Sequence, residues 1–233
     1  MTISQSQKPG QKPAKPVSRI QENILAVSER RLLNWLCARM PMWVTPDFLT
    51  SFGVVGAFAI FAGYALSLFG VAWLWLAIVG YVMQWFGDSM DGSLARFRKI
   101  ERPRFGFFID HSCDGLTLLL ILAGIGLSPY VTLSIALVTL AGYLLLSIHA
   151  YLATHVLGEM RLSYLSLGPT ELRFALIFTT FMMMVMGYDR DWFYPVSGFD
   201  LLFGGAGAIM IVIFVVQTLK TARQLAAEDS KKL

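Results

Sequence analysis

The sequence predicts an all-α, polytopic membrane protein, and three observations support this fold class. Of the 233 residues, 56% are hydrophobic and only 15% are charged, whereas a soluble domain carries nearer a quarter charged residues. The apolar residues gather in runs of about 20, the length of helix that crosses a bilayer core of roughly 30 Å. Lysine and arginine gather between alternate runs. The apolar excess indicates that lipid is part of the solvent.

The chain begins with a polar, basic and proline-rich stretch, residues 1–19, without the apolar core of a signal peptide. We expect a flexible cytosolic tail there. Residues 20–43 predict an amphipathic helix that lies in the membrane interface. Its apolar residues share one face: Leu32, Leu33, Leu36 and Met40. A helix packed on the cytosolic ends of the bundle would show the same stripe. Pro41 and Pro46 then redirect the chain into the membrane.

Residues 44–223 are expected to form six transmembrane helices, and residues 224–233 a cytosolic tail. The predicted spans are 48–69, 71–90, 107–126, 130–155, 171–187 and 201–219. Basic residues precede the first span, lie in the connections after the second and fourth, and follow the sixth. Because positive residues mark the cytoplasmic side, both termini should face the cytoplasm. The basic clusters also suit an anionic leaflet surface, and no pattern indicates nucleic acid as a partner.

Four aspartates lie where the second predicted span ends and the third begins. Asp88 and Asp91 share one helical face, and Asp110 and Asp114 share another. Pro103 allows a tight turn between the two helices, which brings the four carboxylates together near the cytoplasmic end of the bundle. Like charges repel strongly in a medium of low dielectric constant, so the group must protonate, pair with arginine or bind cations. Hard oxygen ligands select Mg²⁺ or Mn²⁺, and two such ions would clamp phosphoryl oxygens.

Small residues and one arginine accompany the aspartates. Gly92 and Ala95 leave a groove without large side chains, where a flat base or a ribose could approach the helix. Helix–helix packing would explain Gly92 equally well. Arg96 is the one basic residue built into this pattern, and it does not balance four acids.

The order of these residues resembles the signature of the CDP-alcohol phosphotransferases, also called CDP-alcohol phosphatidyltransferases. The matching positions are Asp88, Asp91, Gly92, Ala95, Arg96, Gly106, Asp110 and Asp114. The resemblance implies transfer of a substituted phosphate from a CDP-linked donor to an acceptor hydroxyl, with release of CMP, in phospholipid synthesis. It also implies a homodimer in the membrane, with the active site on the cytoplasmic side.

The same resemblance implies roles for individual residues. The four aspartates would hold two Mg²⁺ or Mn²⁺ ions, and Asp114 would also be the general base that deprotonates the acceptor. Gly92 and Ala95 would line the cytidine pocket, Arg96 would steady the nucleotide, and Gly106 belongs to the same substrate-binding set.

Two further segments carry candidate binding residues. Thr45-Pro46-Asp47-Phe48-Leu49-Thr50 is similar to a family element that approaches the nucleotide. Thr50 is the expected contact, because Asp47 replaces the usual asparagine and an ionised aspartate only accepts hydrogen bonds. Arg173, at the start of the fifth predicted span, could bind a donor or acceptor phosphate, with Glu171 as its ion-pair partner. Snorkelling to the membrane surface would also explain Arg173.

Two other functions remain open at this point. A membrane prenyltransferase also uses aspartates and Mg²⁺ to hold a diphosphate, but usually places them in two well-separated motifs. A cation transporter could use the same four acids as an ion path, although neither repeated halves nor broken helices are evident. Within the resembled family, the sequence does not distinguish a CDP-diacylglycerol donor with a polar acceptor from a CDP-choline or CDP-ethanolamine donor with a diacylglycerol-like acceptor.

Overall fold

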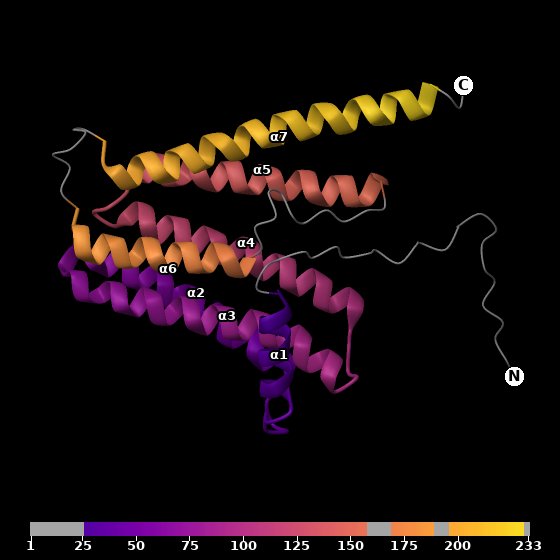
Figure 1. The fold of residues 1–233 in the computed structure, drawn as a ribbon, viewed down its shortest axis with the longest axis horizontal. Coiled ribbons are helices and arrows are strands. Elements are labelled where there is room, and N and C mark those ends of the chain that lie inside the picture. The colour runs from indigo at the N-terminus through magenta and orange to yellow at the C-terminus, as the bar shows by residue number, and fades with distance from the viewer. Residues whose placement is uncertain (1–25, 158–168, 189–195, 231–233) are drawn as a thin grey trace, which may run out of the picture.

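The computed structural model describes residues 26–157, 169–188 and 196–230, and these residues form helices joined by short connections. Six long helices run side by side along the length of the molecule, and one short helix crosses them (Figure 1). No strand occurs within the described ranges, which confirms the predicted all-α class. The predicted tail at residues 1–19 lies outside them.

Each predicted span corresponds to one long helix. The six are α2 (Pro46–Leu66), α3 (Leu74–Phe97), α4 (Pro103–Leu127), α5 (Leu133–Leu157), α6 (Pro169–Met186) and α7 (Gly198–Ser230). Two short 3-10 helices, η1 (Ser67–Phe69) and η2 (Val71–Trp73), join α2 to α3. α7 continues through most of the segment predicted to be a cytosolic tail, and its end extends beyond the other helices (Figure 1).

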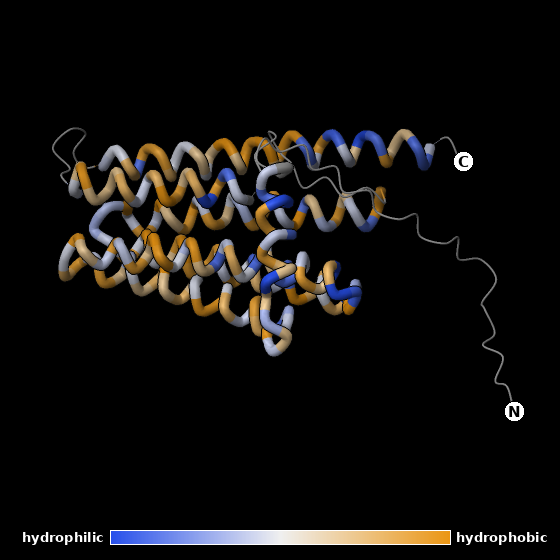
Figure 2. The backbone as a smooth tube through the Cα atoms, turned by 60° about the horizontal axis from the view of Figure 1, so that its bottom comes forward, coloured by the Kyte–Doolittle hydropathy of each residue, from blue (hydrophilic) through white to orange (hydrophobic). Residues whose placement is uncertain are grey.

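Four helices are long and apolar enough to cross a membrane. They cover Pro46–Phe69, Pro103–Leu127, Leu133–Leu157 and Gly198–Ser230. Charged side chains lower the apolar character of the other two, α3 and α6, which nevertheless lie within the same bundle. Apolar residues cover most of the bundle, and the hydrophilic ones gather toward one end (Figure 2). This arrangement is consistent with an integral membrane protein, and six spans stay a prediction.

The N-terminal helix, α1 (Ala26–Cys37), is shorter than predicted. Residues 20–25 lie outside the described part, and the extension of a helix to residue 43 is wrong. Pro41 explains the early end, because proline has no N–H to donate to the Cys37 carbonyl and disfavours the helical conformation at Met40. The Arg98 guanidinium holds the linker in turns, since it donates hydrogen bonds of 2.6–3.1 Å to the carbonyl oxygens of Met40, Pro41 and Val44.

α1 lies across the bundle and buries one of its faces against it (Figure 1). Leu33 and Cys37 are buried beside Met90 of α3, so the apolar stripe includes a packing face on the bundle. On the opposite face Trp35 is exposed, with the Arg39 guanidinium 4.0 Å above its ring centroid. Tryptophan and arginine together suit the headgroup layer, which supports the interfacial placement.

Glycines bring the backbones of α2 and α3 into direct contact. A Cβ atom added at Gly56 would lie 2.6 Å from the backbone nitrogen of Gln84, and one at Gly87 would lie 2.5 Å from that of Gly53. Any other residue at these positions would push the helices apart, which is why small residues dominate close helix contacts in membranes. The contact fixes the register of α3 on α2, and therefore the position of the aspartates that follow Gly87.

A buried aspartate fastens the opposite end of the bundle. Asp200, 1% exposed, accepts hydrogen bonds from the backbone N–H of Thr132 at 2.6 Å, from the Thr132 hydroxyl at 3.1 Å and from the backbone N–H of Ser197 at 3.1 Å. The Ser197 hydroxyl in turn donates to the Tyr130 carbonyl at 2.9 Å. The start of α7 is thereby joined to the connection between α4 and α5, and the carboxylate is fully engaged.

Replacing Gly56 by alanine should destabilise the protein, because the added methyl group meets the α3 backbone. We expect a loss of about 2 kcal/mol, as for other overpacked sites, measured as a lower thermal-unfolding midpoint in detergent. Gly205→Ala is the matched control: no atom lies within 4 Å of its added Cβ, so the change should be neutral or stabilising by up to about 1 kcal/mol. Equal midpoints for the two variants would contradict a constraining contact.

Asp200→Ala should lower the same midpoint more than Asp47→Ala does. The first change leaves three donors near Thr132 and Ser197 unpaired, at a cost of about 3 kcal/mol. The second removes an ion pair to Arg102 whose side chains are 51% and 59% exposed, and such pairs contribute under about 1 kcal/mol. Indistinguishable melting of the two variants would show that Asp200 does not hold this end together.

Candidate metal and phosphate site

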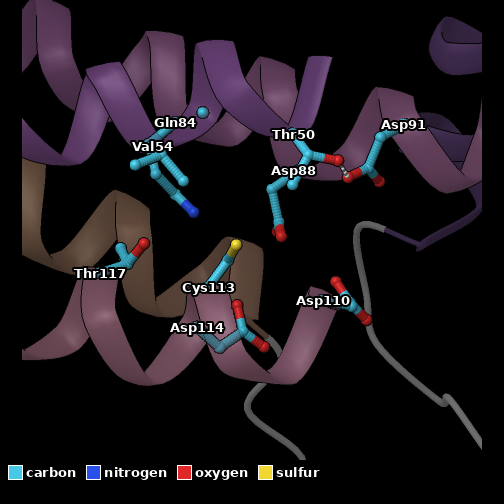
Figure 3. Close-up of a pocket in the computed structure, with 10 residues that line it drawn as sticks. Thr50, Val54, Gln84, Asp88, Asp91, Asp110, Cys113, Asp114 and Thr117 are labelled. Atoms are coloured by element: carbon cyan, nitrogen blue, oxygen red, sulfur yellow. Dashed lines mark hydrogen bonds between the residues drawn. The ribbon is translucent and has the colours of Figure 1, made fainter. Parts of the chain in front are cut away.

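Three aspartate side chains from two helices meet between α3 and α4. Asp88 of α3 and Asp110 and Asp114 of α4 each offer one carboxylate oxygen, and these atoms all lie within 4.8 Å of one another. Asp88 reaches from α3 toward α4, where Asp110 and Asp114 follow one turn apart (Figure 3). The convergence predicted from the spacing therefore occurs for these three.

The carboxylates face a small cavity between α2, α3 and α4. Its lining residues are Thr50, Gly53, Val54, Gln84, Asp88, Asp91, Asp110, Cys113, Asp114 and Thr117. Oxygen atoms dominate the polar part of this lining, which is the donor set that Mg²⁺ and Mn²⁺ prefer. The residues present thus fit a hard divalent cation, although the thiol of Cys113 also reaches the cavity (Figure 3).

Asp91 lines the same cavity but has a different set of partners. Its Oδ2 accepts a hydrogen bond of 2.6 Å from the Thr50 hydroxyl, and its Oδ1 accepts one of 2.5 Å from the backbone N–H of Gly92. It does not belong to the group of three carboxylates within 4.8 Å. Thr50, predicted to contact substrate, is thus placed at the site, where it orients one of the predicted metal ligands.

Arg173 supplies the positive charge that the aspartates need. Its Nη2 donates to Asp88 Oδ2 at 2.5 Å and its Nε donates to Gln84 Oε1 at 2.7 Å. Arg96, the basic residue within the sequence pattern, instead donates a hydrogen bond of 3.3 Å to the Ser93 hydroxyl.

The expected pairing of Arg173 with Glu171 is wrong. Arg173 points to α3, and both carboxylate oxygens of Glu171 are buried without a hydrogen-bond partner among the residues that the structure describes.

The other predicted binding residues lie outside the cavity. A Cβ at Gly92 would lie 3.2 Å from Arg96 Nη1, so the guanidinium covers this glycine on the surface of α3. Ala95 is partly exposed one turn further along. Gly106 lies in the first turn of α4, and within the described part of the chain no other segment comes within 4 Å of an added Cβ. The structure therefore places Gly92, Ala95 and Arg96 together beside Asp91, and Gly106 on an open part of α4.

Two polar residues beside the motifs have structural contacts. Asp47, which replaces the asparagine of the resembled element, forms an exposed ion pair with Arg102. The connection between α3 and α4 is thereby joined to the start of α2. His111 packs its ring against Phe107, with centroids 4.2 Å apart, and against Tyr151 of α5 at 5.3 Å. It flanks the site, with its Nδ1 3.4 Å from Asp110 Oδ2, and is not one of the three residues whose ligand atoms converge.

Besides Gly53 and Val54, three cavity residues with polar or thiol side chains were not predicted as site residues: Gln84, Cys113 and Thr117. Helical spacing carried a signal for all three, since Gln84 is four residues before Asp88, Cys113 is three after Asp110 and Thr117 is three after Asp114.

Comparison with known proteins agrees with the motif. A family model described as CDP-alcohol phosphatidyltransferase matches residues 43–222, which covers most of the chain and the whole site. No curated protein sequence matches the chain closely enough to count as a relative. The matched segment contains five of the long helices, most of α7 and the four aspartates. The chain belongs to the CDP-alcohol phosphatidyltransferase family, membrane transferases of phospholipid synthesis.

Proposed function

We propose that the protein transfers a substituted phosphate from a CDP-linked donor to an acceptor hydroxyl and releases CMP. The observation that carries the proposal is the meeting of Asp88, Asp110 and Asp114 at one cavity within the matched family segment. Family membership favours this reaction over prenyl transfer or cation transport. Both donor classes, CDP-diacylglycerol and CDP-choline or CDP-ethanolamine, fit the proposal.

Asp88, Asp91, Asp110 and Asp114 are the proposed ligands of two Mg²⁺ or Mn²⁺ ions. When bound, such ions neutralise the charge on the oxygens of the donor diphosphate. Three of the carboxylates already point at a common position, and Thr50 holds the fourth at the rim of the cavity. The polypeptide contributes this arrangement before any substrate arrives, so little reorganisation is needed during the reaction.

Asp114 is the proposed general base. Its carboxylate takes the proton of the acceptor hydroxyl while the acceptor oxygen bonds to the β-phosphorus of the donor. The bond between that phosphorus and the oxygen of CMP breaks, and CMP leaves with the electron pair. Gly92, Ala95 and Arg96 lie together beside Asp91, which supports their assignment to the nucleotide.

We also propose that the active site faces the cytoplasm. Hydrophilic residues gather toward one end of the bundle (Figure 2). The basic connection between α3 and α4, with Arg98 and Arg102, lies between the two helices that carry the aspartates. Positive residues on the cytoplasmic side and a water-soluble nucleotide both favour this orientation.

The test is CMP release by purified protein in detergent. CDP-diacylglycerol would be paired with glycerol phosphate, inositol phosphate or serine, and CDP-choline or CDP-ethanolamine with diacylglycerol. CMP that forms with Mg²⁺ or Mn²⁺ and disappears with EDTA would support the reaction and identify the donor class. Metal-independent turnover, or prenyl transfer without CMP, would contradict the proposal.

Asp114→Asn should reduce CMP release at least about 100-fold, because the amide neither accepts the proton nor binds the cation as strongly. Asp88→Asn should behave similarly through loss of a metal ligand. Glu228→Gln, the same chemical change at an exposed position near the end of α7, should retain wild-type turnover. Thermal unfolding of each variant would verify that the fold is intact, and a folded Asp114→Asn enzyme with undiminished turnover would exclude Asp114 as the base.

A further inference from the structure

Arg173 is a cation held on a carboxylate that the proposed function assigns to a metal. Its guanidinium reaches from α6 to Asp88 Oδ2 and to Gln84 Oε1. The side chains of Arg173 and Asp88 are only 13% and 23% exposed. A charge-assisted pair that is this well shielded from water is far stronger than a surface ion pair. The Asp88 carboxylate therefore already has a positively charged partner before any metal binds.

The Asp88 carboxylate faces both the guanidinium and the proposed metal position. Asp88 contributes one of the three carboxylates within 4.8 Å of one another. Among the residues that the structure describes, Arg173 is the one lysine or arginine that forms an ion pair with this group. A divalent cation at the centre of the group would lie close to the guanidinium and would repel it.

We propose that Arg173 is an internal counter-cation that competes with the metal for Asp88. In the metal-free protein it neutralises part of the acidic cluster and stabilises the fold. Metal binding displaces the guanidinium from Asp88, so Arg173 lowers the affinity for the metal. The inference rests on the proposed metal site and adds that the Arg173 guanidinium occupies part of this site when the metal is absent.

A hydrogen-bond network keeps Arg173 near the site in both states. One turn before it, the Thr170 hydroxyl donates to the carboxylate of Glu29 in α1 at 3.0 and 3.1 Å. Glu29 also accepts from Trp85 Nε1 at 3.0 Å and from the Ser89 hydroxyl at 3.2 Å. The start of α6 is thus tied to α1 and to the turn of α3 that carries Asp88.

A second set of bonds holds α6 further along its length. The Tyr64 hydroxyl of α2 lies 2.6 Å from the Thr180 hydroxyl and 3.2 Å from that of Tyr81 in α3, and all three side chains are buried. With both anchors in place, only the Arg173 side chain has to move.

Arg173 also borders a groove of about 200 Å³ between α3 and α6, beside Tyr81, Trp85 and Phe174. The exposed surface of this groove is apolar, which disfavours a charged group there. A guanidinium displaced from Asp88 therefore remains close to the cavity that holds the aspartates. Metal binding would therefore free the Arg173 guanidinium to bind an anionic group. The metal would bind first and the phosphate second.

Metal affinity is the direct test, and it needs no turnover. Mn²⁺ would be titrated into the purified full-length protein without nucleotide, and free Mn²⁺ would be followed by its electron paramagnetic resonance signal. Arg173→Gln should bind Mn²⁺ roughly tenfold more tightly than the wild type, because a nearby positive charge is removed. Arg104→Gln, the same change at an exposed position in the first turn of α4, should bind like the wild type.

Thermal unfolding tests the metal-free state, in which the substitution should lower stability although it raises metal affinity. Arg173→Gln without metal should melt below the wild type, because the aspartates lose their counter-charge. Saturating Mn²⁺ should then raise its midpoint more than that of the wild type. Arg173→Gln that binds Mn²⁺ no more tightly than the wild type would overturn the inference while leaving the metal site in place. Absence of saturable Mn²⁺ binding in every variant, the wild type included, would overturn the site itself.

A measurement on the unaltered protein makes the test independent of how the variant folds. An arginine-specific dicarbonyl reagent would be applied with and without Mg²⁺, and modified peptides would be quantified by mass spectrometry. Labelling of Arg173 should rise severalfold with Mg²⁺, relative to Arg104 in the same sample. Labelling that is unchanged or reduced by Mg²⁺ at saturation would show that the guanidinium stays on Asp88, and would exclude displacement.

Discussion

The close contact between α2 and α3 is the constraint on which the site depends. Gly56 and Gly87 allow the two backbones to meet without intervening side chains. A helix pair in this contact has almost no freedom to slide, because each glycine fits against one particular backbone atom of the other helix. Thr50 of α2 consequently lies at hydrogen-bond distance from Asp91 of α3. In a bilayer, where apolar burial does not drive helices together, such steric fit must supply the specificity.

This arrangement concentrates negative charge between α3 and α4. Residues from distant parts of the chain balance that charge. Asp88 and Asp110 come from adjacent helices, yet the neutralising Arg173 lies 85 residues beyond Asp88. Glu29, 141 residues before Thr170 in sequence, helps to hold the arginine's helix. The acids are thus assembled locally by two neighbouring helices, whereas the balance of charge is a property of the whole bundle.

The sequence predicted what depends on spacing and composition. Apolar runs located all six long helices, and the four-residue interval between Asp110 and Asp114 was enough to place both on one face. Prediction from the sequence failed where a contact joins segments that are far apart in the chain. Arg173 was expected to pair with Glu171, its near neighbour in the sequence, whereas it pairs with Asp88 of α3. No role was predicted for Asp200, because the groups that surround it come from the preceding connection and from Thr132.

α7 is longer than a membrane requires. Its 33 residues give about 50 Å of helix, against a hydrocarbon core of roughly 30 Å. Since Asp200 fastens its first turn at one end of the bundle, the excess projects from the other (Figure 1). The last turns, with Lys220 and Arg223, therefore form a rigid spacer into water. A fluorophore or affinity handle attached at Ser230 would stand clear of the detergent belt, at a fixed distance from the bilayer and without touching the catalytic helices.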